Sequence, residues 1–242
     1  MRRLLMLTLA LSLLLGGMAW AGNEDLFADV KAASWAIYVR STGGMEAKCS
    51  AIAIETDADK TYLLSAGHCF IGNDLNKTDF LVTQDHRTFF KAKVAKSGMS
   101  LKAGMKAEST DMGDYNGDDW ALVEAQAGNK PIIPLGNSKE LRIGEDLIIV
   151  GVPFGLDFLA VQGIVGSLDI SLSSKIWNHY YGGNVYVAGG NSGSGIISVK
   201  QKAIVGIVNA GPGMQSSMLI FMPVSLLPVD LFEAEKKQIS KP

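Results

Sequence analysis

Three short segments of the 242-residue chain carry side chains that together could perform acyl transfer. His68 follows an apolar strand, Asp119 precedes the apolar stretch that begins at Trp120, and Ser192 lies in a glycine-rich turn. An imidazole base, a carboxylate that orients it and a serine nucleophile are the three parts of a hydrolytic triad. Each segment alone is a weak signal, because a lone histidine is more often structural and glycine-rich turns are common. The combination of all three predicts a nucleophilic hydrolase.

The elements that must position these side chains are β-strands, because hydrophobicity along the chain mostly alternates with a period of two. A polar breaker at 128–131 divides the strands into two halves of about 100 residues each, a size typical of small barrels or sandwiches. Near the end, Asp230 and Glu233 predict the start of a short C-terminal helix that continues to Gln238. The predicted strands cover 35–40, 51–54, 80–83, 89–94, 120–125, 147–151, 159–165, 195–199 and 203–208.

The first residues form a targeting segment rather than part of the fold. A basic start and an apolar run over 4–15 precede the small-x-small cleavage pattern of Ala19, Trp20 and Ala21. The apolar run is shorter than the roughly 20 residues that a membrane-spanning helix needs. We therefore predict a signal peptide at 1–21, a secreted or periplasmic mature protein, and no stable membrane insertion after cleavage.

Export decides how the two cysteines of the chain, Cys49 and Cys69, are interpreted. In an oxidising compartment an even number of cysteines favours a disulfide, and their separation without C-x-x-C spacing makes a poor zinc site. Two buried free thiols are the alternative. Because His86 and His179 also lack partners at helical metal spacing, we expect neither a metal nor another cofactor.

Composition excludes several other classes of protein. With 48% hydrophobic and 19% charged residues, the chain has the composition of a folded globular protein rather than a disordered one. The formal net charge is -2, and no segment has the clustered lysine and arginine residues that bind a phosphate backbone. Nucleic acid is therefore not an expected partner.

At the histidine and serine segments, the sequence resembles the chymotrypsin-like (trypsin-like) serine protease superfamily. Residues 64–69 fit the family's pattern around the catalytic histidine, and Gly190, Ser192 and Gly193 fit its serine motif. The chain order of histidine, aspartate and serine also agrees with this family. Three further segments look most like the bacterial high-temperature-requirement proteases and glutamyl endopeptidases; these are 151–155, 162–165 and 206–209.

The resemblance implies an all-β fold of two antiparallel Greek-key barrels with the active site in the cleft between them. It places His68 and Asp119 in an N-terminal barrel at 22–127, and Ser192 in a C-terminal barrel at 128–242 that also carries the short helix. A bridge between Cys49 and Cys69 would correspond to the disulfide that commonly braces the family's histidine loop. The family's oxyanion donors correspond to the backbone N–H groups of Gly190 and Ser192.

Two details of the aspartate and serine segments refine this comparison. The family's acid stands two positions before Ala-Leu, which favours Asp119 over the neighbouring Asp118. Asn191 stands where trypsin-type enzymes have the aspartate that pairs with a new amino terminus, so trypsin-style activation is not expected. Because the sequence ends at Pro242, without the peptide-binding module that usually follows high-temperature-requirement catalytic domains, we expect a single catalytic unit.

The expected function is that of a secreted serine endopeptidase that cleaves polypeptide substrates through an acyl-enzyme. No acidic or basic residue stands in the segments that correspond to the family's specificity pocket, which predicts a preference for small or medium apolar side chains. A non-catalytic binding or scaffold protein on the same fold is the alternative function, and the oligomeric state is left open. The residues expected to bind substrate are Val187, Ala188, Val208, Asn209 and Ala210.

Overall fold

The structure is a computed structural model that describes residues 23–41, 44–75, 78–106, 109–171, 178–213 and 215–231. The predicted signal peptide at 1–21 lies outside these residues. So does most of the predicted C-terminal helix, whose expected start at Asp230 lies in a turn at the end of the described chain.

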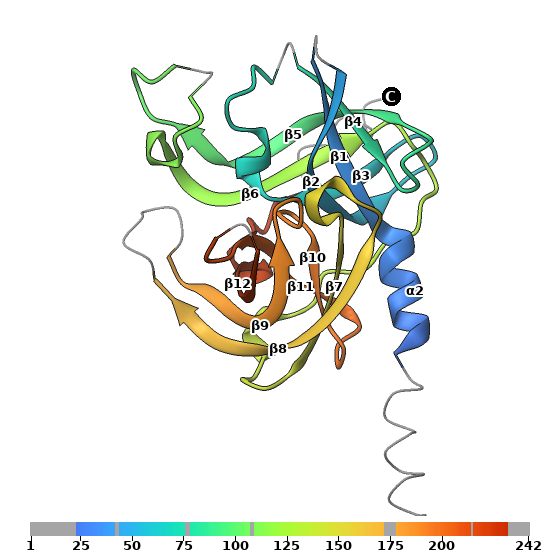
Figure 1. Cartoon of the computed structure of the whole chain (residues 1–242), viewed down its shortest axis with the longest axis vertical. Coiled ribbons are helices and arrows are strands. Elements are labelled where there is room, and N and C mark those ends of the chain that lie inside the picture. Colours follow the sequence, from blue (N-terminus) through green and yellow to red (C-terminus); the bar gives the residue numbers. More distant parts are fainter. Residues whose placement is uncertain are drawn as a thin grey trace, which may run out of the picture.

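Two closed antiparallel barrels make up most of the described chain, which confirms the predicted all-β fold. Figure 1 shows the first barrel, blue to green, above the second, yellow to red. The first consists of β1 (Ser34–Ser41), β2 (Gly44–Thr56), β3 (Thr61–Ser65), β4 (Asp79–Thr83), β5 (Phe90–Leu101) and β6 (Tyr115–Ala125). The second consists of β7 (Asp146–Gly151), β8 (Leu159–Ile170), β9 (Tyr180–Ala188), β10 (Gly195–Ser198), β11 (Ala203–Ala210) and β12 (Gln215–Pro223).

The two barrels have the same strand order. The first closes in the order β1-β2-β3-β6-β5-β4, and the second in the equivalent order β7-β8-β9-β12-β11-β10. In each barrel the third strand therefore lies beside the sixth rather than beside the fourth, so that the path along the chain is a Greek key. This order places β3, which precedes the histidine segment, directly beside β6, which carries Asp119.

The apolar core continues from one barrel into the other. One cluster of buried side chains contains Trp35, Leu64 and Leu122 of the first barrel together with Ile148 and Ile207 of the second. Strands β3 and β11 are buried along nearly their whole length, because they pack on both faces. The barrels are therefore held together by hydrophobic burial, and the surfaces where they meet have a fixed geometry.

A helix that the sequence analysis did not predict precedes the first barrel. Helix α2 (Glu24–Ala33) buries Leu26, Val30 and Ala33, which are spaced by four and three residues as one face of a helix requires. It packs against β2 of the first barrel and β7 of the second, and Figure 1 shows it along the edge of the second barrel. Among the residues that the structure describes, no helix has the length and apolarity that a bilayer crossing requires.

The connection between the barrels runs from residue 126 to residue 145. The boundary predicted between residues 127 and 128 falls within it. At Gly128 a side chain would collide with the carbonyl oxygen of Ala58, so glycine is needed there for the connection to pass close to the first barrel.

Candidate active site

His68 lies in the 3-10 turn η1 (Gly67–Phe70), directly after β3. Its ring Nδ1 is 2.8 Å from Oδ2 of Asp119, and its backbone N–H donates to Oδ1 of the same carboxylate at 2.7 Å. The Asp119 side chain is completely buried, whereas the His68 side chain is 22% exposed. Asp119, rather than Asp118, therefore contacts the imidazole. Its one carboxylate binds both the ring and the backbone N–H of His68.

His68 and Asp119 each shift the other's pKa in the direction that favours the charged form. Burial by itself lowers the pKa of the His68 imidazole, but the charge and hydrogen bond of Asp119 outweigh it, so the pKa is raised above its usual value of 6.5. Burial by itself raises the pKa of the Asp119 carboxyl. The charge of His68 and the hydrogen bonds from His68 and Asn209 outweigh that effect and keep this pKa below its usual value. Asp119 is therefore a carboxylate at neutral pH.

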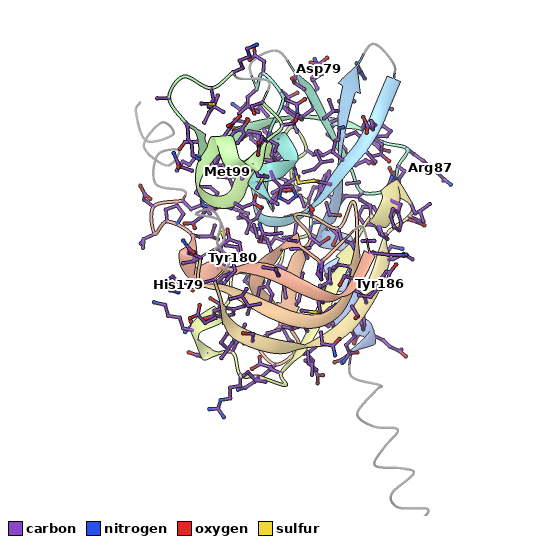
Figure 2. The ribbon with its side chains drawn as sticks, turned by 60° about the vertical axis from the view of Figure 1, so that its left-hand side comes forward. Asp79, Arg87, Met99, His179, Tyr180 and Tyr186 are labelled. Carbon is purple, nitrogen blue, oxygen red and sulfur yellow. A yellow bond between two sulfur atoms is a disulfide. The ribbon has the colours of Figure 1, made fainter. Side chains whose placement is uncertain are left out.

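The second barrel also holds Asp119. The hydroxyl of Tyr180, at the start of β9, accepts the backbone N–H of Asp119 at 2.9 Å, and the side-chain amide of Asn209 donates to the Asp119 carbonyl at 2.7 Å. Burial raises the pKa of Tyr180 well above its usual value, so its hydroxyl stays neutral. Figure 2 shows Tyr180 where the two barrels meet. The sequence analysis missed Tyr180 and assigned Asn209 to substrate binding alone.

Ser192 lies between β9 and β10, and the second barrel places it against the histidine turn. Its carbonyl oxygen is 3.9 Å from Sγ of Cys69, the residue next to His68. Its carbonyl also accepts the backbone N–H of Ser50 of the first barrel at 2.8 Å. These two contacts place the backbone of Ser192 beside the turn that carries His68, where the barrels meet.

A cavity of about 250 Å³ adjoins Ser192. Tyr186 does not fill it, because this side chain is 46% exposed and its hydroxyl donates to the amide oxygen of Gln215. Figure 2 shows Tyr186 on the outside of the second barrel. The five residues expected to bind substrate all line this cavity, whose wall consists of Val187, Ala188, Gly189, Ser192, Val208, Asn209, Ala210, Gly211 and Gly213.

The loop before Ser192 turns at a glycine whose backbone conformation other residues rarely adopt. Gly190 has a φ of +98°, and a side chain on it would collide with the carbonyl oxygen of Val152. Within the described residues, the backbone N–H groups of Gly190 and Ser192 donate to no acceptor. These two donors are therefore free to bind an oxyanion.

The predicted disulfide between Cys49 and Cys69 is present and joins β2 to the histidine turn. Both sulfur atoms and a ring nitrogen of His68 lie within 4.8 Å of one another. Because the sulfurs are bonded to each other, they offer no thiolate to a metal ion. The disulfide fixes the turn that carries His68 to strand β2.

Reduction of this disulfide is expected to lower both stability and activity. The bond closes a loop across 20 residues, for which chain entropy predicts a loss of about 3 kcal/mol in the free energy of unfolding. Thermal unfolding and peptide hydrolysis, measured before and after reduction and alkylation, test this expectation. A reduced and alkylated protein with the parent's Tm and rate would contradict it.

Solved structures share this fold at low sequence identity. The HtrA-type protease AlgW, solved with a decapeptide, has a TM-score of 0.65 and 18% identity, over 83% of this chain and 63% of that one. The same protease, solved with a tripeptide, has a TM-score of 0.63 and 19% identity, over 83% and 60% of the two chains. At these identities the likeness shows the fold alone.

Relatives with similar sequences are described as serine endoproteases. A probable periplasmic serine endoprotease, DegP-like, from Pseudomonas fulva (strain 12-X) is 28% identical over 178 residues, which are 72% of this chain and 36% of the relative. Another of that description, from Halomonas elongata, is 26% identical over 129 residues, which are 52% of this chain and 27% of the relative. The chain thus spans only about a third of the length of these relatives or less.

The strongest assignment comes from a family model described as the trypsin-like peptidase domain. It matches residues 49–207, a range that begins at the disulfide and includes His68, Asp119 and Ser192. This range covers more than half of the chain and parts of both barrels. The chain therefore belongs to the family of trypsin-like peptidase domains.

Proposed function

We propose that the chain is an exported serine endopeptidase with a triad of His68, Asp119 and Ser192. The observation that carries the proposal is the pair of contacts, at 2.7 and 2.8 Å, between the buried Asp119 carboxylate and His68. By accepting a hydrogen bond from the N–H at Nδ1, Asp119 fixes the imidazole tautomer whose Nε2 can act as a base.

In the proposed reaction, Oγ of Ser192 attacks the carbonyl carbon of the scissile peptide bond while Nε2 of His68 takes its proton. The resulting oxyanion accepts the backbone N–H groups of Gly190 and Ser192. His68 then protonates the leaving amine, the C–N bond breaks, and an acyl-enzyme remains on Ser192. A water molecule, deprotonated by His68, attacks the ester carbonyl. The bond from that carbon to Oγ of Ser192 then breaks, Oγ takes the proton back from His68, and the acid product leaves.

The cavity beside Ser192 supports a preference for small or medium apolar side chains at the residue before the cleaved bond. Among the described residues that line it, none is charged, and Val187, Ala188, Val208 and Ala210 supply apolar side chains. A lysine, arginine or glutamate side chain would enter without a counter-charge, which is costly. Discrimination between neighbouring aliphatic side chains is weak, so the preference is broad.

The proposed location is the periplasm or the exterior of the cell. The signal-peptide pattern at 1–21 directs export, and the disulfide between Cys49 and Cys69 suits an oxidising compartment. The relatives named above are described as periplasmic. We further propose that the substrate adds as an extended strand alongside 208–211, where it is bound through its backbone.

A peptide-library cleavage profile tests the activity and its specificity together. The protein is incubated with the library before and after treatment with a serine-phosphonylating reagent. We expect cleavage after alanine, valine and similar side chains, and its loss once mass spectrometry finds the reagent on Ser192. Dominant cleavage after lysine, arginine, aspartate or glutamate would overturn the apolar preference, and a protein that neither cleaves nor is labelled would overturn the proposed enzyme.

A further inference from the structure

The oxyanion loop, residues 189–192, is held by donors that approach its carbonyl groups. The carbonyl of Gly189 accepts the backbone N–H of Phe154, that of Gly190 accepts the hydroxyl of Ser50 at 2.8 Å, and that of Asn191 accepts the backbone N–H of Ser194 at 3.0 Å. In a trans peptide unit, C=O and N–H point in opposite directions. The bonds to Gly189 and Asn191 therefore turn the N–H groups of Gly190 and Ser192 away from these donors.

Ser50 is the one residue of the first barrel in this set. Besides its bond to Gly190, its hydroxyl accepts the backbone N–H of Val152 at 3.0 Å, and its own N–H donates to the carbonyl of Ser192 at 2.8 Å. The Ser50 side chain is completely buried. A side chain on Gly193 would collide with the Ser50 carbonyl, so the loop packs directly on this residue.

We propose that the Ser50 hydroxyl is a positioning group that keeps the oxyanion loop in its anion-binding conformation. The inference rests on the proposed function, because it assigns a role in the same acyl-transfer step. Phe154 and Ser194 hold the loop through backbone groups, whereas Ser50 does so through a side chain that substitution can remove. Gly190 imposes little conformational restraint of its own. The Asn191 N–H holds one side of the Gly190–Asn191 peptide unit by donating to the Ala188 carbonyl at 3.0 Å, and the Ser50 hydroxyl holds the other side.

Substitution Ser50→Ala removes the hydroxyl and leaves the backbone bond to Ser192 in place. The Gly190 carbonyl then loses its donor and the Val152 N–H its acceptor, both in a buried site. The Ser50 bond holds the Gly190–Asn191 peptide unit, which lies between the two oxyanion donors. Without it, the N–H groups of Gly190 and Ser192 on either side are less well aligned with the oxyanion, which forms only in the transition state. We expect kcat to fall about 10- to 100-fold while KM changes less than about threefold.

Ser34→Ala is the matched control. Ser34 is also a buried serine near the barrel interface, and its hydroxyl donates to the carbonyl of Val30 at 2.7 Å and reaches that of Val150 at 3.5 Å. It touches no residue of the oxyanion loop in these contacts. We expect a fall in Tm similar to that of Ser50→Ala, with kcat within about twofold of the parent.

Three further measurements separate positioning from general stability. Affinity for a peptide boronate, whose tetrahedral adduct uses the oxyanion donors, is expected to fall about 10-fold in Ser50→Ala, whereas affinity for the product peptide stays unchanged. Ser50→Thr, which keeps the hydroxyl, is expected to recover most of kcat. Amide hydrogen exchange over 188–194 is expected to be faster in Ser50→Ala than in Ser34→Ala.

The outcomes distinguish this inference from the proposed function. If the parent cleaves peptides and Ser50→Ala keeps its kcat within twofold, or Ser34→Ala loses as much, the positioning role is wrong and the peptidase remains. If the parent cleaves no peptide, the proposed peptidase function is wrong. Independently of activity, an unchanged rate of amide hydrogen exchange over 188–194 in Ser50→Ala would overturn the role of Ser50. Should Ser50→Ala fail to fold, Ser50→Gly replaces it in each comparison.

Discussion

Ser192→Ala is expected to remove peptidase activity from a protein that still folds, with kcat/KM lowered by about 10⁴- to 10⁶-fold. The substitution deletes only the nucleophilic oxygen, while the carbonyl of residue 192 still accepts the Ser50 N–H and the disulfide is untouched. Hydrolysis of casein and of one preferred peptide measures activity, and circular dichroism with Tm measures the fold.

The control for this variant is Ser217→Ala, at an exposed serine of β12. It should match the parent in rate and in Tm. A Ser192→Ala protein that hydrolyses casein at the parent's rate would show that another residue is the nucleophile. If Ser192→Ala lost activity because it failed to fold, its circular dichroism spectrum would differ from the parent's. Loss of the nucleophile alone would leave the spectrum unchanged.

Asp119→Asn is expected to lower kcat by about 10⁴-fold with little change in KM. The amide has nearly the shape of the carboxylate, but its NH₂ group donates where Nδ1 of His68 needs an acceptor. The imidazole then carries its proton on Nε2, so it cannot accept the proton of Ser192. Asp118→Asn is the matched control, and its kcat should stay within about tenfold of the parent because the Asp119 contacts with His68 remain.

The pH dependence of the two proteins follows from the same contact. His68 must be neutral to act as a base, and Asp119 raises its pKa above 6.5. The activity of the parent is therefore lost as pH falls through a midpoint above 6.5. Residual activity of Asp119→Asn should have a lower midpoint, because the carboxylate that stabilises the imidazolium is gone. An unchanged midpoint in kcat/KM profiles would show that Asp119 does not act on His68.

Strand positions were predictable where hydrophobicity alternates between turn signals, as in β1 and β4. Strands β9 and β12 were missed, because β9 is interrupted by Gly182 and Gly183, and β12 opens with polar residues. Helix α2 was missed although Leu26 and Val30 have helical spacing, because the segment follows closely on the predicted signal peptide. The prediction of two Greek-key barrels came from the family resemblance rather than from the hydrophobic pattern itself.

The predicted site depends on short motifs, so His68, Asp119 and Ser192 could be found from their neighbours in sequence. Their catalytic roles stay predictions, whereas the contact between His68 and Asp119 is present in the structure. Tyr180 and Ser50 gave no signal of this kind. Each acts across the interface between barrels, at sequence separations of 61 and 140 residues, and such contacts depend on how the barrels dock.

The support of Asp119 by Tyr180 and Asn209 has a consequence for the newly made chain. A ribosome that has completed only β1 to β6 has produced His68 and Asp119, but none of the second-barrel groups that hold them. Asn209 belongs to β11, the last strand but one of the described chain. Under the proposed function, a competent site can therefore assemble only after β11 of the second barrel has been made.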